Sequence, residues 1–296
     1  MRFSILTPSY GYGRFIGDAV SSVLGQRRVE VEHIVVDGAS TDETVQVLTS
    51  LSADPRLQWV SEPDDGQSSA LNKALSRAKG DWVGWLNADE FYLPDTLASV
   101  EDAIVANPRV DVLYGDFLEV DVEGKLLRLV AEHAYSRTAL RGLRWCYIPS
   151  CTTFVRREAI SDEPWDSQCV SMMDWDWFLE MAGAGLRFAH LRQPLAAFRR
   201  HPHQVSESAA AQTEAEYRLI RNRHGIPAAG ARVIVARICG RGAHVLRKVG
   251  EGGYVRELRM HRRLGENLRW FDSVSDRTAA SGASAQPCQD TTRPVA

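Results

Sequence analysis

The chain has 296 residues, of which 44% are hydrophobic and 25% charged, and its formal net charge at pH 7 is −3. These values are typical of a globular protein with one large domain or two small ones, and they give no overall attraction to nucleic acid. The five cysteines are odd in number and contain no C-x-x-C pair, so they suggest neither a disulfide framework nor a zinc site. Because no long apolar run occurs, we expect no signal peptide, no membrane-spanning segment and a cytoplasmic location.

Strand and helix patterns alternate along the first hundred residues. Strands are predicted at 3–6, 31–36, 57–60 and 82–86, and helices at 14–24, 42–51 and 67–78. This alternation predicts an α/β fold with a mainly parallel sheet flanked by crossover helices.

A second half follows with a helix at 94–106, strands at 110–114 and 125–130, a helix at 175–182 and a strand at 187–190. We therefore divide the sheet-forming chain into residues 1–110 and 111–206. Residues 207–272 are expected to form a basic helical extension. Residues 273–296, rich in Ser, Ala, Thr and Pro, are expected to be a disordered tail.

Oxygen-bearing side chains follow the strand at 82–86, namely those of Asn87, Asp89 and Glu90. The carboxyl end of a strand is where open α/β sheets bind ligands. Mg²⁺ and Mn²⁺ take oxygen ligands and complete their shells with substrate phosphates and water. The segment therefore predicts a divalent-cation site, and a solvated acidic turn is the alternative.

Two further strands end in Thr7-Pro8-Ser9-Tyr10 and Val36-Asp37-Gly38, so these ends are expected to face one crevice. A carboxylate at Asp37 can accept an N–H from uracil, thymine or guanine, whereas cytosine offers no ring N–H. UDP-, dTDP- or GDP-type nucleotides are therefore favoured. Asp42 is expected to cap the following helix or to lie in its first turn.

A competing motif lies between these two strands. The run Gly11-Tyr12-Gly13-Arg14-Phe15-Ile16-Gly17 resembles a dinucleotide-binding fingerprint, but Ile16 occupies the third glycine position. Residues 7–10 also separate the strand from the first glycine, where that fingerprint needs an immediate turn. An NAD(P)-dependent oxidoreductase is therefore the alternative enzyme class.

Four segments together carry a family resemblance. They are Thr7-Pro8-Ser9-Tyr10, Val36-Asp37-Gly38-Ala39-Ser40-Thr41-Asp42, Glu62-Pro63-Asp64-Asp65-Gly66-Gln67-Ser68-Ser69-Ala70-Leu71-Asn72-Lys73-Ala74 and Leu86-Asn87-Ala88-Asp89-Glu90. In order and spacing they resemble the signatures of family 2 glycosyltransferases. The resemblance implies a GT-A fold, a nucleoside-diphosphate sugar donor, a divalent metal and inversion at the anomeric carbon. It makes 1–110 the donor half and 111–206 the acceptor and catalytic half.

The resemblance also implies roles for single residues. It assigns Asp89 to the metal, Asp37 to the base, and to the donor site Thr7, Pro8, Ser9, Tyr10, Asp64, Asn72, Lys73, Asn87 and Ala88. Asn87 replaces the first acid of the D-x-D type motif, and an amide is a poorer metal ligand, so binding should depend on Asp89 and the donor diphosphate. By its position near a helix start Lys73 suits phosphate, or else it belongs to a solvated helix face.

Two segments of the second half resemble further family motifs. Ser171-Met172-Met173-Asp174-Trp175-Asp176-Trp177 places Asp174 at the position of the catalytic base, with Asp176 as the runner-up. The alternative is that Asp174 is an N-cap, and Trp175 or Trp177 is available to stack on a sugar. In Phe198-Arg199-Arg200-His201-Pro202-His203-Gln204-Val205-Ser206 the resemblance brings His201 to the metal or the diphosphate, and a basic surface turn is the alternative.

We therefore expect a glycosyltransferase that uses Mn²⁺ or Mg²⁺ and moves a sugar to a glycan or lipid-linked acceptor hydroxyl in bacterial surface polysaccharide synthesis. The chain lacks the Q-x-x-R-W motif and transmembrane helices of processive members, so single-sugar addition is expected. A catalytically silent protein that binds nucleotide-sugar is a further alternative. In the segment Tyr147–Phe154, where the family often has an acceptor loop, Cys151 is interpreted as a small buried residue.

Residues 231–249 are predicted to form a basic amphipathic helix. One side, spanning about 120°, carries Ile234, Val235, Ile238, Val245, Leu246 and Val249, and the other carries Arg232, Arg237, Arg241, Arg247 and Lys248. Residues 221–270 contain 12 Lys and Arg against 3 Asp and Glu. This pattern suits a peripheral location on anionic lipid at the inner face of the plasma membrane, which is one of two hypotheses. The alternative is that the apolar stripe packs on the rest of the protein.

Overall fold

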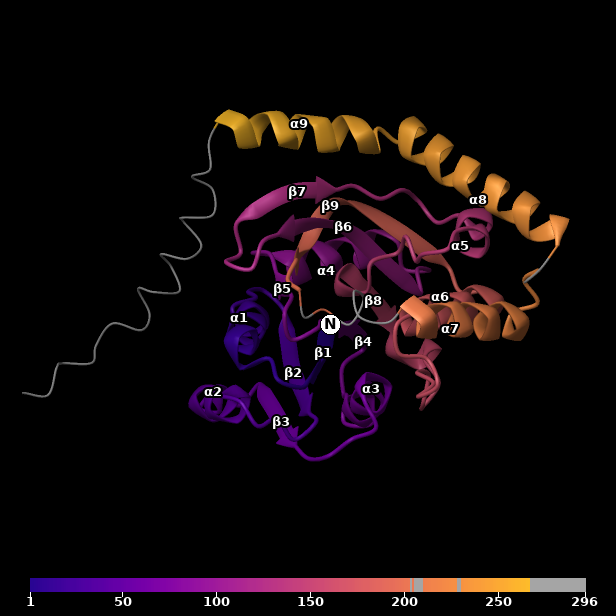
Figure 1. The fold of residues 1–296 in the computed structure, drawn as a ribbon. Coiled ribbons are helices and arrows are strands. Elements are labelled where there is room, and N and C mark those ends of the chain that lie inside the picture. The colour runs from indigo at the N-terminus through magenta and orange to yellow at the C-terminus, as the bar shows by residue number, and fades with distance from the viewer. Residues whose placement is uncertain (203, 205–209, 228–229, 267–296) are drawn as a thin grey trace, which may run out of the picture.

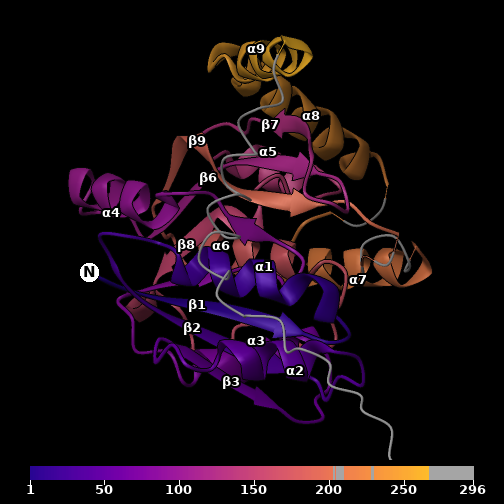
Figure 2. The same ribbon diagram turned by 90° about the vertical axis from the view of Figure 1, so that its left-hand side faces the viewer.

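A computed structural model of the protein describes residues 1–202, 204, 210–227 and 230–266. Within this part of the chain a single nine-stranded sheet runs through both halves, in the order β3-β2-β1-β4-β8-β6-β9-β5, with β7 paired to β6. Helices lie on both sides of the sheet (Figures 1 and 2). The expected α/β fold, with a mainly parallel first half, is confirmed.

The first half alternates strands and helices as predicted. Its strands are β1 (Arg2–Ser9), β2 (Glu30–Asp37), β3 (Leu57–Ser61) and β4 (Trp82–Trp85), and its helices are α1 (Gly13–Leu24), α2 (Thr44–Leu51) and α3 (Gln67–Leu75). All four strands are parallel, with β1 between β2 and β4. The carboxyl ends of β1, β2 and β4 therefore lie side by side.

The second half is mixed. It comprises β5 (Phe91–Tyr92), α4 (Thr96–Ala106), β6 (Val112–Val120), β7 (Leu126–Val130), α5 (Arg137–Gly142), the 3₁₀ turns η1 (Ser150–Thr152) and η2 (Arg157–Ala159), β8 (Thr153–Arg156), α6 (Met173–Gly183) and β9 (Phe188–Arg199). Strand β8 is antiparallel to both β4 and β6, so it joins the two halves.

Strand β9 is much longer than the strand predicted at 187–190. It continues through Pro194 to Arg199, and its register against β6 shifts near Pro194. Proline offers no N–H to a ladder, which is why the sequence indicates an early end to this strand. The shift in register allows the strand to continue. The residues that follow it therefore reach the carboxyl end of β4.

Alternating side chains on the parallel strands form a core on each face of the sheet. On β2, Ile34 and Val36 pack with α3 and α6, whereas Val31 and Val35 pack with α1 and α4. Continuous apolar strands of this kind are buried on both faces because helices cover both. The buried faces leave the loops at the carboxyl strand ends to carry polar side chains.

Three helices follow the sheet: α7 (Ala210–Arg223), α8 (Ala231–Gly250) and α9 (Gly253–Glu266). Helices α8 and α9 lie along one edge of the molecule, beyond α5 and β7 (Figure 1). Helix α8 meets α5 where a Cβ on Gly240 would lie 2.6 Å from the backbone of Gly142. The predicted helix at 231–249 is confirmed, and the tail at 273–296, His203 and Ser206 lie outside the described residues.

The orientation of α8 contradicts the packing alternative for its apolar stripe. Ile238 and Leu246 are 66% and 73% exposed. Lys248, expected on the solvent side, is buried and pairs with Glu257 at 2.8 Å, and the Arg237 guanidinium lies over the Tyr217 ring. The helix packs on α5 through Gly240, and Arg237 and Lys248 also face the protein, so the apolar side is left facing solvent. Among the described residues, no helix is both long and apolar enough to cross a bilayer.

Candidate functional site

Thr7 links the ends of the three central strands. Its hydroxyl donates to the Leu86 carbonyl at 2.7 Å and therefore accepts the Nε2–H of His33 at 2.8 Å. Burial lowers the pKa of His33 to about 3, so this ring is neutral. Pro8 and Ser9 are buried beside Thr7, whereas Tyr10 is 68% exposed. Of the four, Tyr10 is thus the residue whose side chain is open to a ligand from solvent.

Asp37 is fully buried at the end of β2 and organises the loop that follows. Its carboxylate accepts the N–H of Ser40 at 2.9 Å, the hydroxyl of Ser61 at 2.7 Å and the hydroxyl of Ser40. The Ser40 oxygen in turn accepts the N–H of Gly11 at 2.8 Å. The Asp37 carbonyl also accepts the N–H of Glu62. Asp37 therefore joins three loops at the expected crevice, with both carboxylate oxygens engaged.

The glycine-rich run has a structural explanation. Gly11 has a positive φ of 72°, and a Cβ on Gly13 would lie 2.5 Å from the Glu43 side chain. Asp42 accepts the N–H of Gly13 at 2.9 Å and that of Thr44 at 3.1 Å. The carboxylate thus supports the starts of α1 and α2. The expectation that Asp42 is the N-cap or lies in the first turn is wrong by one position, because Glu43 is the N-cap of α2 and Asp42 precedes it.

Asn87 offers no free oxygen to a metal. Its Oδ1 accepts the Gln67 Nε2–H and the Trp85 Nε1–H, each at 2.8 Å. Ala88 beside it is 1% exposed and packs in the core. The amide at the first position of the D-x-D type motif therefore holds the strand end in place.

Asp89 and His201, which are 112 residues apart in the sequence, meet at the carboxyl end of β4. The His201 Nε2 lies 2.9 Å from Asp89 Oδ2, and the two residues are 8% and 7% exposed. The His201 ring packs on Phe15 with centroids 5.0 Å apart, and the Arg199 Nε–H donates to the Asp89 carbonyl at 3.2 Å. A carboxylate oxygen and an imidazole nitrogen converging on one point suit a borderline divalent ion such as Mn²⁺.

Glu90, one of the oxygen-bearing residues predicted for the cation site, and Tyr12, which no sequence motif marks, belong to the same acidic neighbourhood. Burial and then the charge of Asp89 raise the pKa of Glu90, whose carboxylate accepts the Asn87 N–H at 2.8 Å. Burial and the charges of Asp89 and Glu90 raise the pKa of Tyr12. The charge of Asp174 also raises the pKa of Glu90, so the predicted base lies near this site.

Asp174 is the second residue of α6 and is partly buried. The N-cap is Met172, so the N-cap interpretation of Asp174 is wrong; its Oδ1 accepts the N–H of the next residue, Trp175, at 2.7 Å. Burial raises the pKa of Asp174 to about 6. A carboxyl with this pKa is ionised at pH 7 and is still basic enough to take a proton, as a general base requires.

The other candidates in α6 have structural roles. The two Asp176 oxygens contact Arg223 and, at 2.7 Å, His224, which fixes α6 to α7. The expectation that Trp175 or Trp177 stacks on a sugar is wrong, because they are 0% and 2% exposed. The aromatic residues of α6 pack in the hydrophobic core.

Asn72 and Lys73 belong to α3 and are engaged by neighbouring loops. The Asn72 amide donates to the Trp165 carbonyl at 2.8 Å, and Lys73 pairs with Glu62 at 2.9 Å. Both line a depression that also includes Trp165 and Arg223 but not Asp37 or Asp89. Asp64 accepts the N–H of Gly66, which precedes α3, at 2.9 Å.

Cys151 is buried beside β8, and burial raises the pKa of its thiol well above the usual value. Its interpretation as a small buried residue is confirmed. A thiol in this environment stays protonated and is a poor nucleophile.

Known proteins share this sequence pattern. An uncharacterized glycosyltransferase of Nostoc sp. is 27% identical over 168 residues, which cover 54% of this chain and 52% of the relative. Chondroitin synthase of Escherichia coli is 27% identical over 192 residues, or 64% of this chain and 28% of the synthase. This chain thus spans about half of the first relative and a smaller share of the second.

Solved structures share the fold. Staphylococcus aureus TarS 1–349 in complex with UDP-GlcNAc has a TM-score of 0.60 at 17% identity, over 80% of this chain and 70% of that one. The mannosyltransferase PcManGT from Pyrobaculum calidifontis, in complex with GDP-Man and Mn²⁺, has a TM-score of 0.50 at 21% identity, over 75% and 61%. These likenesses establish the GT-A fold expected from the sequence.

The family assignment rests on a match to a protein-family profile. Residues 4–163, more than half of the chain, match the profile described as "Glycosyl transferase family 2". That range includes the carboxyl ends of β1, β2 and β4 together with Asp37 and Asp89. The chain therefore belongs to glycosyl transferase family 2.

Proposed function

We propose that this protein transfers a sugar from a nucleoside-diphosphate sugar to a hydroxyl of a glycan or lipid-linked acceptor, with inversion and with Mn²⁺ or Mg²⁺. The observation that carries the proposal is the contact of Asp89 with His201 at 2.9 Å, at the strand ends where Asp37 organises the neighbouring loop. The complexes of TarS with UDP-GlcNAc and of PcManGT with GDP-Man and Mn²⁺ support such a donor and metal. The similarity to chondroitin synthase supports a role in bacterial surface polysaccharide synthesis.

Asp89 and His201 are the residues that would hold the ion. When bound, a divalent ion neutralises the negative charge that develops on the leaving diphosphate. The Phe15 ring packs on His201 and the Arg199 guanidinium holds the Asp89 backbone, so both ligands are kept in place. The Asn87 oxygen is engaged elsewhere, so we assign no metal contact to it.

Asp174 acts on the acceptor. Its carboxylate takes the proton of the acceptor hydroxyl as the new bond forms from that oxygen to the anomeric carbon. The bond from the anomeric carbon to the diphosphate oxygen breaks at the same time, and the configuration inverts because attack comes from the opposite face. The raised pKa of Asp174, about 6, suits this transfer at neutral pH.

The donor contacts are assigned to the loops that Asp37 joins. Tyr10, Asp64 and the backbone around Ala88 are proposed to line the donor, with Thr7, Pro8 and Ser9 forming the buried support beneath them. The Asp37 carboxylate accepts three hydrogen bonds from Ser40 and Ser61 and is fully buried, so a base can reach its remaining acceptor site only if the surrounding loops move. We propose that this movement accompanies recognition of a UDP-, dTDP- or GDP-type nucleotide. For Lys73 to reach a phosphate, it must leave Glu62.

Calorimetry of donor binding tests the metal assignment. Asp89→Ala is expected to abolish Mn²⁺-dependent donor binding and transfer, while Asp102→Ala, an exposed carboxylate on α4, leaves both unchanged. Asp89→Ala that binds donor equally well with and without Mn²⁺ would contradict the assignment.

Two assays separate the competing functions. An NAD(P)-dependent oxidoreductase would bind NADH and ignore UDP with Mn²⁺, so fluorescence titration with both ligands distinguishes it. A catalytically silent protein would bind donor without consuming it. Slow Mn²⁺-dependent hydrolysis of a nucleotide-sugar, lost in Asp89→Ala, would exclude that function.

We also propose that α8 and α9 hold the protein at an anionic membrane surface, on its cytoplasmic side. Their solvent-facing side carries Ile234, Val235, Ile238, Val245, Leu246, Val249, Val255 and Leu258, all exposed. Exposed arginines flank this face at Arg232, Arg241, Arg247 and Arg259. An apolar stripe bordered by arginines suits the boundary between headgroups and acyl chains.

Vesicle flotation tests the membrane proposal with matched variants. Changing Arg232, Arg241 and Arg247 to Gln is expected to abolish flotation with anionic vesicles at low salt. Changing Arg27 and Arg77, which are exposed elsewhere, is expected to leave it intact. The proposal would be overturned if both variants float equally well. It would also be overturned if the wild type and both variants all remain at the bottom of the gradient.

A further inference from the structure

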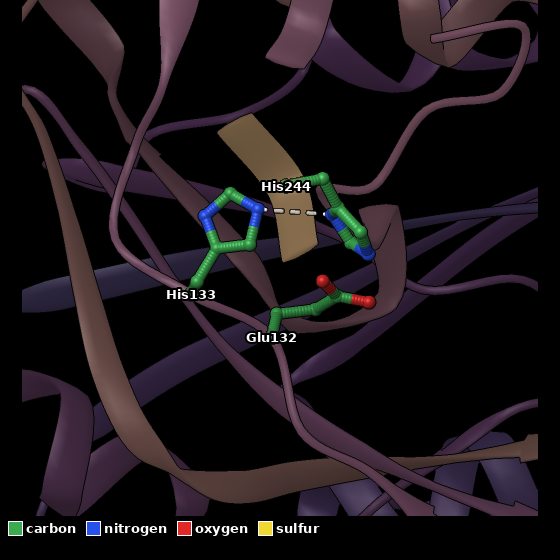
Figure 3. Close-up of side chains that lie close together, drawn as sticks. All are labelled: Glu132, His133 and His244. Carbon is green, nitrogen blue, oxygen red and sulfur yellow. Dashed lines mark hydrogen bonds between the residues drawn. The ribbon is translucent and has the colours of Figure 1, made fainter. Parts of the chain in front are cut away.

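A second cluster of metal-binding side chains lies away from the strand-end site, where the segment after β7 meets α8. Ligand atoms of Glu132, His133 and His244 all lie within 4.8 Å of one another (Figure 3). His133 Nε2 and His244 Nδ1 are 2.9 Å apart. Two nitrogen ligands about 2.1 Å from one ion lie about 3.0–3.4 Å apart. The two rings therefore already face one point with nearly the spacing of shared ligands.

The far side of the His133 ring is arranged as in a metal-bound histidine. Its Nδ1 donates to the Ala134 carbonyl at 2.7 Å, so its Nε2 lone pair accepts the Nδ1–H of His244, and a bound ion would take the place of that shared proton. Such a carbonyl contact fixes the tautomer and orientation of metal-bound histidines. The Tyr147 ring stacks on His133 with centroids 4.5 Å apart. His133 is thus held in one orientation before any ion binds.

Glu132 supplies an unpaired carboxylate oxygen. The residue is 6% exposed, and its Oε2 is buried without a hydrogen-bond partner among the described residues. The nearby cations are engaged elsewhere: Lys248 pairs with Glu257 at 2.8 Å, and Arg256 pairs with Asp116 at 3.3 Å. Leaving a buried carboxylate oxygen unpaired is costly, and a bound cation would offset that cost.

The chemical types of the three ligands support metal binding as well. Two imidazoles and one carboxylate are a ligand set typical of Zn²⁺.

We propose that Glu132, His133 and His244 form a site for a divalent transition metal, Zn²⁺ in the first place, which fastens α8 to the sheet. The metal would join the segment after β7 to α8, whose buried residues are Val233, Gly240 and Lys248. A cross-link at this point would hold α8 in the orientation that exposes its apolar side. The site is independent of the strand-end ion, since it shares no residue with it.

Metal titration of the full-length, metal-free protein tests the site. Co²⁺ serves as the spectroscopic probe and Zn²⁺ as its competitor. The wild type, Asp89→Ala and His261→Gln, an exposed histidine of α9, are expected to give the intense visible absorption of four-coordinate Co²⁺, displaced by one equivalent of Zn²⁺. His244→Gln is expected to weaken binding about 100-fold or more, because it removes a ligand.

Glu132→Gln guards against an unfolded variant, since it keeps the side-chain volume and replaces a ligand oxygen that has no hydrogen bond to lose. It is expected to weaken Co²⁺ and Zn²⁺ binding at least tenfold while its circular dichroism matches the wild type. In the wild type Zn²⁺ is expected to raise the melting temperature. The proposal would be overturned if His244→Gln and Glu132→Gln bind Co²⁺ and Zn²⁺ as tightly as the wild type does. It would also be overturned if Asp89→Ala loses this binding while His244→Gln and Glu132→Gln retain it.

Discussion

Asp174→Asn separates the chemical role of this carboxyl from the cost of burying it. Burial raises the pKa of Asp174 from 3.8 to about 6. Because the folded-state pKa is the higher one, the folded protein holds the proton more tightly, and stability falls as the pH rises from about 4 to 6. Above pH 6 the whole penalty remains, and the difference between the two pKa values corresponds to about 3 kcal/mol.

Asparagine removes the charge and keeps an oxygen for the Trp175 N–H. We therefore expect Asp174→Asn to be more stable than the wild type by up to about 3 kcal/mol at pH 8, with the gain shrinking towards pH 4. Transfer should fall by about 10²-fold or more, with donor affinity within a few-fold. Urea denaturation at several pH values measures the first effect, and initial rates measure the second.

Two results would refute this reasoning separately. Identical stability of variant and wild type at pH 8 would show that the carboxyl is not desolvated, and near-normal turnover would place the base elsewhere. Asp176→Asn is the matched control. It weakens the contacts with Arg223 and His224 and is expected to destabilise the protein by about 1–3 kcal/mol at pH 7.

Three further substitutions test the site and its support. Asn87→Asp adds a second carboxylate while keeping an oxygen for the existing donors, so the Mn²⁺ affinity measured by calorimetry should rise. An unchanged affinity would place the ion away from this residue. Gly240→Ala puts a Cβ 2.6 Å from the Gly142 backbone and should lower the free energy of unfolding, measured by urea denaturation, by about 1–3 kcal/mol. An unchanged free energy of unfolding would mean that α8 packs on α5 differently. Thr7→Val leaves the Nε2–H of His33 unpaired and should cost about 1–3 kcal/mol; a neutral effect would contradict the buried contact.

The sequence predicted the first half of the fold well because β1 to β4 are apolar runs separated by helical periodicity, and both signals are local. It did not predict β8, whose four residues are too few for a pattern to emerge. It ended β9 early because Pro194 disfavours a strand, whereas the sheet accommodates the proline by shifting register. In each case pairing with a strand distant in the sequence determines where the strand forms and ends, and the local sequence pattern does not predict that pairing.

The same distinction applies to the sites. Asp89 and His201 were named because family motifs mark them, although 112 residues separate them. Glu132 and His133 are adjacent, but His244 joins them only because α8 packs on α5 beside the segment after β7, and no motif marks that packing. The sequence also did not decide which side of α8 faces solvent, because an amphipathic pattern defines two sides of a helix without indicating which one contacts the protein.

The hydrogen bonds to the Asn87 oxygen have a consequence for how long an ion stays at the strand ends. Among the described residues, Asp89 and His201 are the two ligands placed there, and an ion that prefers about six would complete its shell with water. Such an ion exchanges freely with the buffer until a diphosphate supplies further oxygens. The occupancy of this metal site would therefore depend on the concentration of the nucleotide-sugar donor. A protein preparation dialysed before the assay would contain no ion at this site.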